Sequence, residues 1–267
     1  MLLELHANPG DLSPEEFANA VRDSGLDAVV VARTNRADGL KPYLSALETV
    51  EVDAFIGVEL ALEKGMVIFI PRETSDAFAG ANWTNEGRPW TRDALKARLG
   101  DLDGAVIASH PYYREEHPAL GDRVYQLTPL AGVVTRIGRG RQVWDRLAEQ
   151  AATKRGVSQF GSSGGDAQHL GAAATVFTED VETQSELVDA IKSGTCLTIE
   201  MDDPAAPRDR EPPRPVARDG DDRRGGRDGR GGRDGRGGRD GRGGRDGRGG
   251  GRDGRGGRDG RGRRPRD

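Results

Sequence analysis

Residues 28–32 read Ala-Val-Val-Val-Ala, an unbroken apolar run that precedes Arg33-Thr34-Asn35. A short run without alternating polar residues predicts a strand buried on both faces, which is typical of a mostly parallel sheet covered by helices. Upstream, Ser13-Pro14-Glu15-Glu16 predicts a helix start, because Ser13 can cap the helix and Glu16 can complete a capping box. The stretch therefore predicts an α/β fold.

Strands and helices alternate over the first 200 residues. Further apolar runs predict strands at residues 2–6, 54–60, 66–70, 105–108, 132–136, 157–160, 174–177 and 196–199. Amphipathic segments predict helices at residues 42–50, 91–99, 142–154 and 185–192. This order indicates a compact, irregular βα barrel. An open doubly wound sheet is the alternative, which is disfavoured because no Gly-x-Gly-x-x-Gly follows the first strand.

The composition changes sharply near residue 204. Residues 208–267 contain 21 Arg against 12 acidic residues, a charge of +9, whereas the rest of the chain carries −13. The repeat Arg-Asp-Gly-Arg-Gly-Gly fills most of this segment, which offers almost no apolar surface to bury. We therefore expect a folded domain over residues 1–203 and a disordered Arg/Gly/Asp-rich tail over residues 204–267.

Other classes of protein are excluded by simple features. A single cysteine, Cys196, rules out intramolecular disulfides and Cys-rich zinc sites. The apolar runs are far shorter than the roughly 20 residues that span a bilayer, so no membrane association is expected. The first residues lack the basic region of a signal peptide, which favours the cytoplasm. The sequence leaves the oligomeric state open.

Polar residues gather at the predicted carboxyl ends of the strands, where a βα barrel carries its chemistry. Imidazole and carboxylate groups there are suitable ligands for zinc, manganese or iron. The candidate metal ligands are His6, Asp11, Glu59, His110 and Asp166.

The order of these segments resembles the PHP superfamily, the polymerase and histidinol phosphatase domain. Its motifs are an acidic-x-His-x-His strand, Thr-Asp-His-Asn, Gly-x-Glu, His-Pro and Gly-Ser-Asp-Ala-His. Their counterparts here are residues 4–8, 32–35, 57–59, 110–111 and 164–168. The resemblance covers residues 2–200. It implies a distorted seven-stranded βα barrel and a two- or three-metal centre that hydrolyses phosphate esters.

Several ligand positions of that family carry other residues in this chain. Asn8 stands for the second His of the first motif, Arg33-Thr34 for the Asp-His of the second, and Gln168 for the last His. Neutral oxygens bind such metals poorly, and an arginine would repel them. A multi-metal centre is therefore not expected, while one divalent ion (Mn, Zn or Fe) or none remains compatible with the retained residues.

Three hypotheses follow for the domain. In the first, which we favour, it is a binding or scaffolding module in which Arg33 pairs with Glu59 or Asp166. In the second, it is a mononuclear metal-dependent phosphoesterase in which His110 and Asp166 hold the ion and Arg114 contacts the phosphate of a small ester. In the third, Arg33 and Arg136 bind a small anionic, phosphorylated ligand.

The tail gives a separate hypothesis. Arginines in Arg-Gly-Gly segments release counterions from nucleic acid phosphates, so weak and salt-dependent RNA binding is one possibility. Each Asp cancels half of the charge of its repeat, and the tail contains no aromatic residue. A solubilising appendage and a contact with the acidic body are therefore the alternatives.

Overall fold

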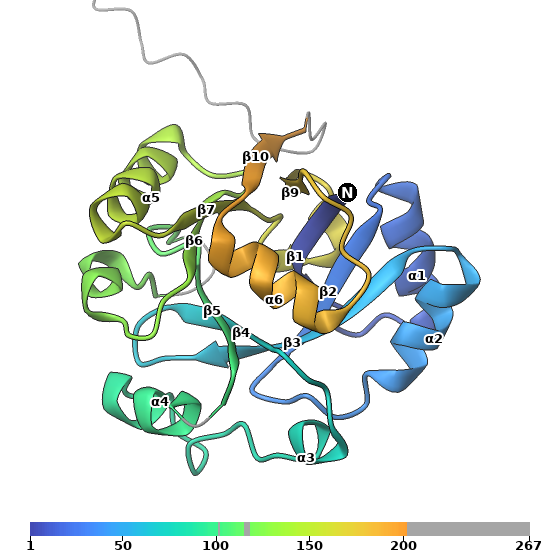
Figure 1. Cartoon of the computed structure of the whole chain (residues 1–267), viewed down its shortest axis with the longest axis horizontal. Coiled ribbons are helices and arrows are strands. Elements are labelled where there is room, and N and C mark those ends of the chain that lie inside the picture. Colours follow the sequence, from blue (N-terminus) through green and yellow to red (C-terminus); the bar gives the residue numbers. More distant parts are fainter. Residues whose placement is uncertain (101, 115–117, 202–267) are drawn as a thin grey trace, which may run out of the picture. The chain divides into compact units, whose positions relative to one another are not determined.

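The computed structural model describes residues 1–100, 102–114 and 118–201 (Figure 1), so the predicted tail lies outside the described residues. The described strands are β1 (Leu2–Asn8), β2 (Ala28–Thr34), β3 (Asp53–Ala61), β4 (Met66–Pro71), β5 (Gly104–Ser109), β6 (Gly132–Arg136), β7 (Ser158–Gly161), β8 (Gly165–Asp166), β9 (Ala173–Phe177) and β10 (Cys196–Glu200). The helices are α1 (Pro14–Asp23), α2 (Lys41–Thr49), α3 (Asp76–Ala79), α4 (Arg92–Leu99), α5 (Gln142–Arg155) and α6 (Gln184–Ser193), with 3-10 turns η1 (Gly121–Gln126) and η2 (Ala167–His169).

One sheet contains all of these strands, in the order β10-β9-β1-β2-β3-β4-β5-β6-β7, and β8 pairs with β1. The pairs β1–β2, β2–β3, β5–β6 and β6–β7 are parallel, whereas β4 runs antiparallel to both of its neighbours. The predicted α/β barrel is confirmed. The described residues form ten strands, of which nine correspond to the predicted apolar runs and one is the two-residue β8, whereas the family resemblance implied seven.

The two edges of the sheet approach each other. The hydroxyl of Thr175 on β9 accepts a hydrogen bond from Gly161 N (3.1 Å) and donates one to Gly161 O (2.8 Å) on β7. The thiol of Cys196 on β10 lies 3.7 Å from Gln159 O, also on β7. Side chains thus bridge the seam where backbone pairing stops, and the sheet is nearly closed.

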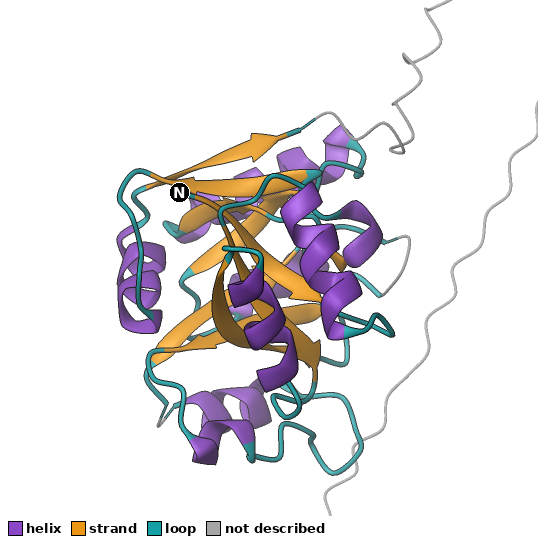
Figure 2. Cartoon of the chain, turned by 90° about the vertical axis from the view of Figure 1, so that its right-hand side faces the viewer, coloured by secondary structure: helices purple, strands orange, loops and turns teal. Residues whose placement is uncertain are grey.

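The helices form a layer outside the sheet (Figure 2), as amphipathic helices between buried strands must. The predicted capping box of Ser13 and Glu16 begins α1, and a second capping box, of Thr183 and Glu186, begins α6. None of the helices in the described part of the chain is long and apolar enough to cross a membrane.

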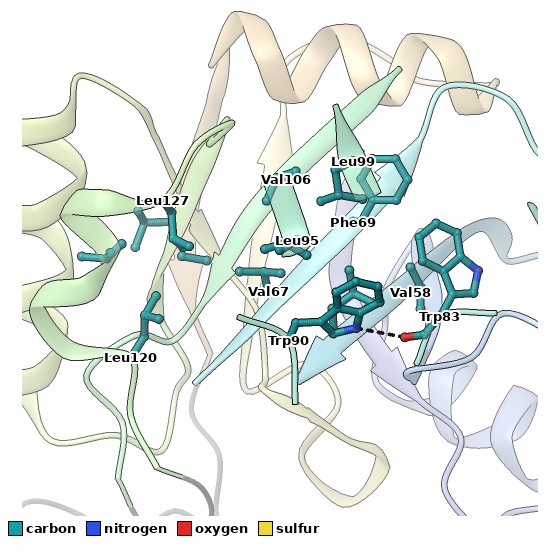
Figure 3. Close-up of a cluster of buried hydrophobic side chains, with 14 of the residues drawn as sticks. Val58, Val67, Phe69, Trp83, Trp90, Leu95, Leu99, Val106, Leu120 and Leu127 are labelled. Carbon is teal, nitrogen blue, oxygen red and sulfur yellow. Dashed lines mark hydrogen bonds between the residues drawn. The ribbon is translucent and has the colours of Figure 1, made fainter. Parts of the chain in front are cut away.

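Buried apolar side chains fill both faces of the strands, as their unbroken apolar runs predict. Leu3, Val30, Ile68, Ile107 and Phe160 belong to one cluster, which α6 joins through its own apolar face. A second cluster lies around α4 and η1 (Figure 3), where Trp90 Nε1 donates to Trp83 O at 3.0 Å. Burial on both faces is what holds the strand ends in fixed positions.

Helix α6 lies across one end of the curled sheet (Figure 1). The side chain of Gln184 at its start bonds Ile56 and Pro71, and the hydroxyl of Ser158, the first residue of β7, bonds Ile191 O in α6. This end carries the amino ends of the parallel strands. Their carboxyl ends, with the predicted site residues, therefore open at the opposite end.

Candidate functional site

A pocket of about 930 Å³ opens at the carboxyl ends of the strands. All five predicted metal ligands, His6, Asp11, Glu59, His110 and Asp166, line it. It is also lined by Asn8, Thr34 and Gln168, the residues that replace expected ligands, and by residues of the β1–α1 loop and α1. The structure thus brings together the positions that the PHP motifs predict to be neighbours, although their function as ligands stays a prediction.

A bulge in β1 aims His6 at this pocket. The β1–β2 register pairs Glu4 with Val29 and Ala7 with Val31, so three steps along β1 match two along β2. The additional residue lets Leu5 and His6 turn to the same side of the sheet, whereas a regular strand would alternate them. The bulge is therefore the local reason that this histidine lies in the pocket.

Two side chains in the buried part of the pocket, His6 and Glu59, lie next to each other. His6 Nε2 lies 3.3 Å from Glu59 Oε1, and the two side chains are only 3% and 4% exposed. Thr34 Oγ1 donates a 2.7 Å hydrogen bond to Glu59 Oε2. Neither ring nitrogen of His6 makes a hydrogen bond within the described residues, although both are buried. A buried imidazole without hydrogen bonds is unusual and indicates a place for a ligand.

Gly165 lies against the His6 ring. Its φ is +89°, and a Cβ built there would stand 2.4 Å from His6 Cε1 and 2.8 Å from His6 Nδ1. Only glycine suits both the left-handed backbone and this close approach. Gly165 of the predicted Gly164-Gly165 pair is therefore explained by its packing against His6.

His110 completes the pocket from the end of β5. Burial lowers the pKa of His110 to about 4, and the nearby Glu59 carboxylate only partly opposes this effect. The ring is therefore neutral at neutral pH and packs edge-on to Tyr113, with 5.5 Å between ring centroids. Its φ of +28° is rare for a residue other than glycine, and such backbone strain is concentrated at functional sites.

Glu4 is a residue whose part in the site was not predicted. Its carboxylate is fully buried and accepts hydrogen bonds from both Ser162 and Ser163 hydroxyls, from Ser163 N (2.8 Å) and from His6 N (3.0 Å). Burial raises the pKa of Glu4, and the serine hydrogen bonds oppose that rise. An acid inside an apolar strand was the available signal, because such a side chain needs partners.

Asp166 and Asp11 are less deeply placed than Glu59. The Asp166 side chain is 39% exposed, and its Oδ1 accepts a hydrogen bond from Gln168 N at 3.0 Å, which caps η2. Asp11 is exposed in the loop after β1. These carboxylates lie at the exposed part of the pocket, whereas Glu59 lies in its buried part.

The arginines predicted to bind anions lie elsewhere. Arg33 is not among the lining residues. Alternate residues of a strand face opposite sides, and Thr34 lies on the pocket side. The guanidinium of Arg33 lies 5.7 Å from the centroid of the Tyr43 ring. Arg136 forms ion pairs with Asp145 (3.2 Å) and Glu149 on α5. The structure therefore gives no support to the expected pairing of Arg33 with Glu59 or Asp166, or to the expected anion site of Arg33 and Arg136, and both stay predictions.

Arg114 also lies outside the lining of the pocket. Its side chain is exposed, just after buried Tyr113. The structure gives no support to its predicted contact with phosphate.

The donor set can be compared with the metal centre that the resemblance implies. Within residues 1–100, 102–114 and 118–201, no group of three or more His, Cys, Asp or Glu side chains lies close enough to hold a metal ion. Asn8, Thr34 and Gln168 add only neutral oxygens. The unsatisfied nitrogens of His6 beside Glu59 are a partial donor set. The residues therefore do not fit a two- or three-metal centre.

The chain is similar to known proteins in sequence and in fold. Residues 144–196 match the family model described as PHP-associated. An amidohydrolase from Chromobacterium violaceum, solved with bound sulfate and no metal, is 12% identical, with a TM-score of 0.50 over 74% of this chain and 97% of that one. A Bifidobacterium adolescentis protein, assigned provisionally as a metal-dependent phosphoesterase, is 13% identical, with a TM-score of 0.46 over 72% and 96%. No curated protein matches the sequence.

Proposed function

We propose that this chain, which carries a PHP-superfamily domain, uses the pocket at its strand ends for binding rather than for multi-metal hydrolysis. The observation that supports the proposal is the set of contacts that the buried Glu59 carboxylate makes. Its carboxylate is held by Thr34 and lies beside His6, in a pocket where Asn8 and Gln168 replace expected histidines. A buried carboxylate with a hydroxyl and an imidazole as neighbours is arranged to hold one polar group. We also propose the cytoplasm as its location.

A mononuclear phosphoesterase is the second candidate, and the unsatisfied ring nitrogens of His6 favour it. His6 and Glu59 would hold the ion, with His110 and Asp166 lining the same pocket. A bound divalent ion would polarise a phosphoryl oxygen. The chain's own His110, which is neutral because burial lowers its pKa to about 4, would orient a proton near the pocket.

Metal analysis separates the two candidates. Full-length protein is incubated with manganese, zinc or iron, desalted and analysed for bound metal, and its hydrolysis of p-nitrophenyl phosphate is measured. The variants are Glu59→Ala in the pocket and Glu48→Ala, an exposed residue of α2, as the matched control.

The binding proposal expects metal well below one ion per chain and no hydrolysis that depends on Glu59. Stoichiometric metal together with hydrolysis that Glu59→Ala abolishes and Glu48→Ala retains would overturn it and establish the phosphoesterase.

A further inference from the structure

The charged residues that line the pocket are acidic. Four carboxylates, those of Asp11, Glu16, Glu59 and Asp166, line it, and none of the described lining residues is Lys or Arg. The Arg139 guanidinium is not part of the lining; it lies 5.6 Å from the centroid of the Tyr113 ring and beside Gly164, where an added Cβ would stand 3.2 Å from Arg139 Nη2. A phosphate that entered without a metal ion would therefore meet several negative charges and no lining cation.

The buried part of the pocket offers acceptors to a cation. Glu59 is a carboxylate with a side chain only 4% exposed, and its protein partners, Thr34 and His6, are residues that can be neutral. His6 has a side chain only 3% exposed and lines the pocket with both ring nitrogens free of hydrogen bonds in the described structure. A neutral imidazole always has one nitrogen that accepts a hydrogen bond. Together these two side chains can receive the N–H groups of a cation.

The distribution of polar and apolar residues suggests an elongated ligand. Asp11 and Glu16 are exposed at the rim, whereas Glu59 is buried, so negative charge is present at both depths of the pocket. Leu12, Ala20 and Met66 also line it and provide apolar contact for methylene groups.

We infer that this pocket binds a small aliphatic cation whose ammonium or guanidinium group is received by Glu59 and His6. The inference rests on the proposed function, because a resident multi-metal centre would occupy the same side chains. It replaces the anionic ligand expected from the sequence, because the arginines that suggested an anion lie outside the pocket.

Isothermal titration calorimetry of the full-length protein with putrescine and agmatine tests the inference. Inorganic phosphate is titrated separately, and potassium chloride keeps the ionic strength constant so that general screening does not change. The variants are Glu59→Gln and Asp166→Asn in the pocket and Glu48→Gln on α2 as the control, each checked for folding by circular dichroism.

The expected result is one saturable site for at least one of the two amines. Glu59→Gln should weaken it at least about tenfold, as expected for loss of a charge-assisted hydrogen bond. Glu48→Gln should bind like the wild type. If Glu59→Gln fails to fold, weakened binding by Asp166→Asn carries the test.

Two results would overturn the inference. One is the lack of saturable amine binding by metal-free protein, and the other is amine binding that neither pocket variant changes. Either result leaves the proposed function standing if metal remains substoichiometric. Stoichiometric metal with hydrolysis dependent on Glu59 overturns the proposed function itself, so the two failures are distinguishable.

Discussion

Replacement of Gly165 by alanine tests the contact on which the pocket is built. The new Cβ would lie 2.4 Å from His6 Cε1 in a residue whose φ is +89°. The left-handed backbone costs about 1–2 kcal/mol for a residue with a Cβ. Overpacking against a buried ring adds about 1–3 kcal/mol. We therefore expect Gly165→Ala to lower the free energy of unfolding by about 2–5 kcal/mol.

Gly156→Ala is the matched control, because Gly156 has φ +64° and a Cβ added there would meet no atom within 4 Å. It should show the backbone cost alone, about 1–2 kcal/mol. Urea unfolding followed by far-UV circular dichroism measures both variants. Equal destabilisation by the two substitutions would refute the close packing of His6 against Gly165, and with it the placement of His6 in the pocket.

Three further outcomes are expected. Glu4→Gln should destabilise the protein by about 1–3 kcal/mol in urea unfolding, because it replaces a buried acceptor of serine and backbone donors; unchanged stability would contradict this. Burial raises the pKa of Asp145 to about 6 against the nearby Arg136, so the free energy of unfolding should fall by up to about 3 kcal/mol as pH rises from about 4 to about 6. Asp145→Asn should remove that slope, and a wild-type profile in the variant would assign the slope to other groups. In an RNA gel shift at two salt concentrations, full-length protein should bind RNA weakly at low salt and lose this binding at high salt. A chain of residues 1–207 should not bind RNA, and identical behaviour of the two forms would show that the tail takes no part in RNA binding.

The amino-acid sequence determined the longer helices and strands and the general position of the site, but not the short elements α3, β8, η1 and η2. Apolar runs such as residues 28–32 and the capping box of Ser13 and Glu16 are local signals, and the structure contains the corresponding strand and helix. The order of the motifs was enough to predict that His6, Glu59 and His110 lie in one pocket, because the carboxyl ends of parallel strands lie at one end of a barrel.

The tertiary structure decided which neighbouring side chain faces the pocket and what each charge contacts. Thr34 and not Arg33 points inward because of strand alternation, and a bulge that depends on pairing with β2 turns His6 inward. Arg136 is neutralised by carboxylates on a helix that follows it in the chain. Such partners are set by register and packing between segments, which no local pattern specifies. The sequence therefore placed the pocket and most of its carboxylates, and only the fold showed that no arginine joins them in the lining.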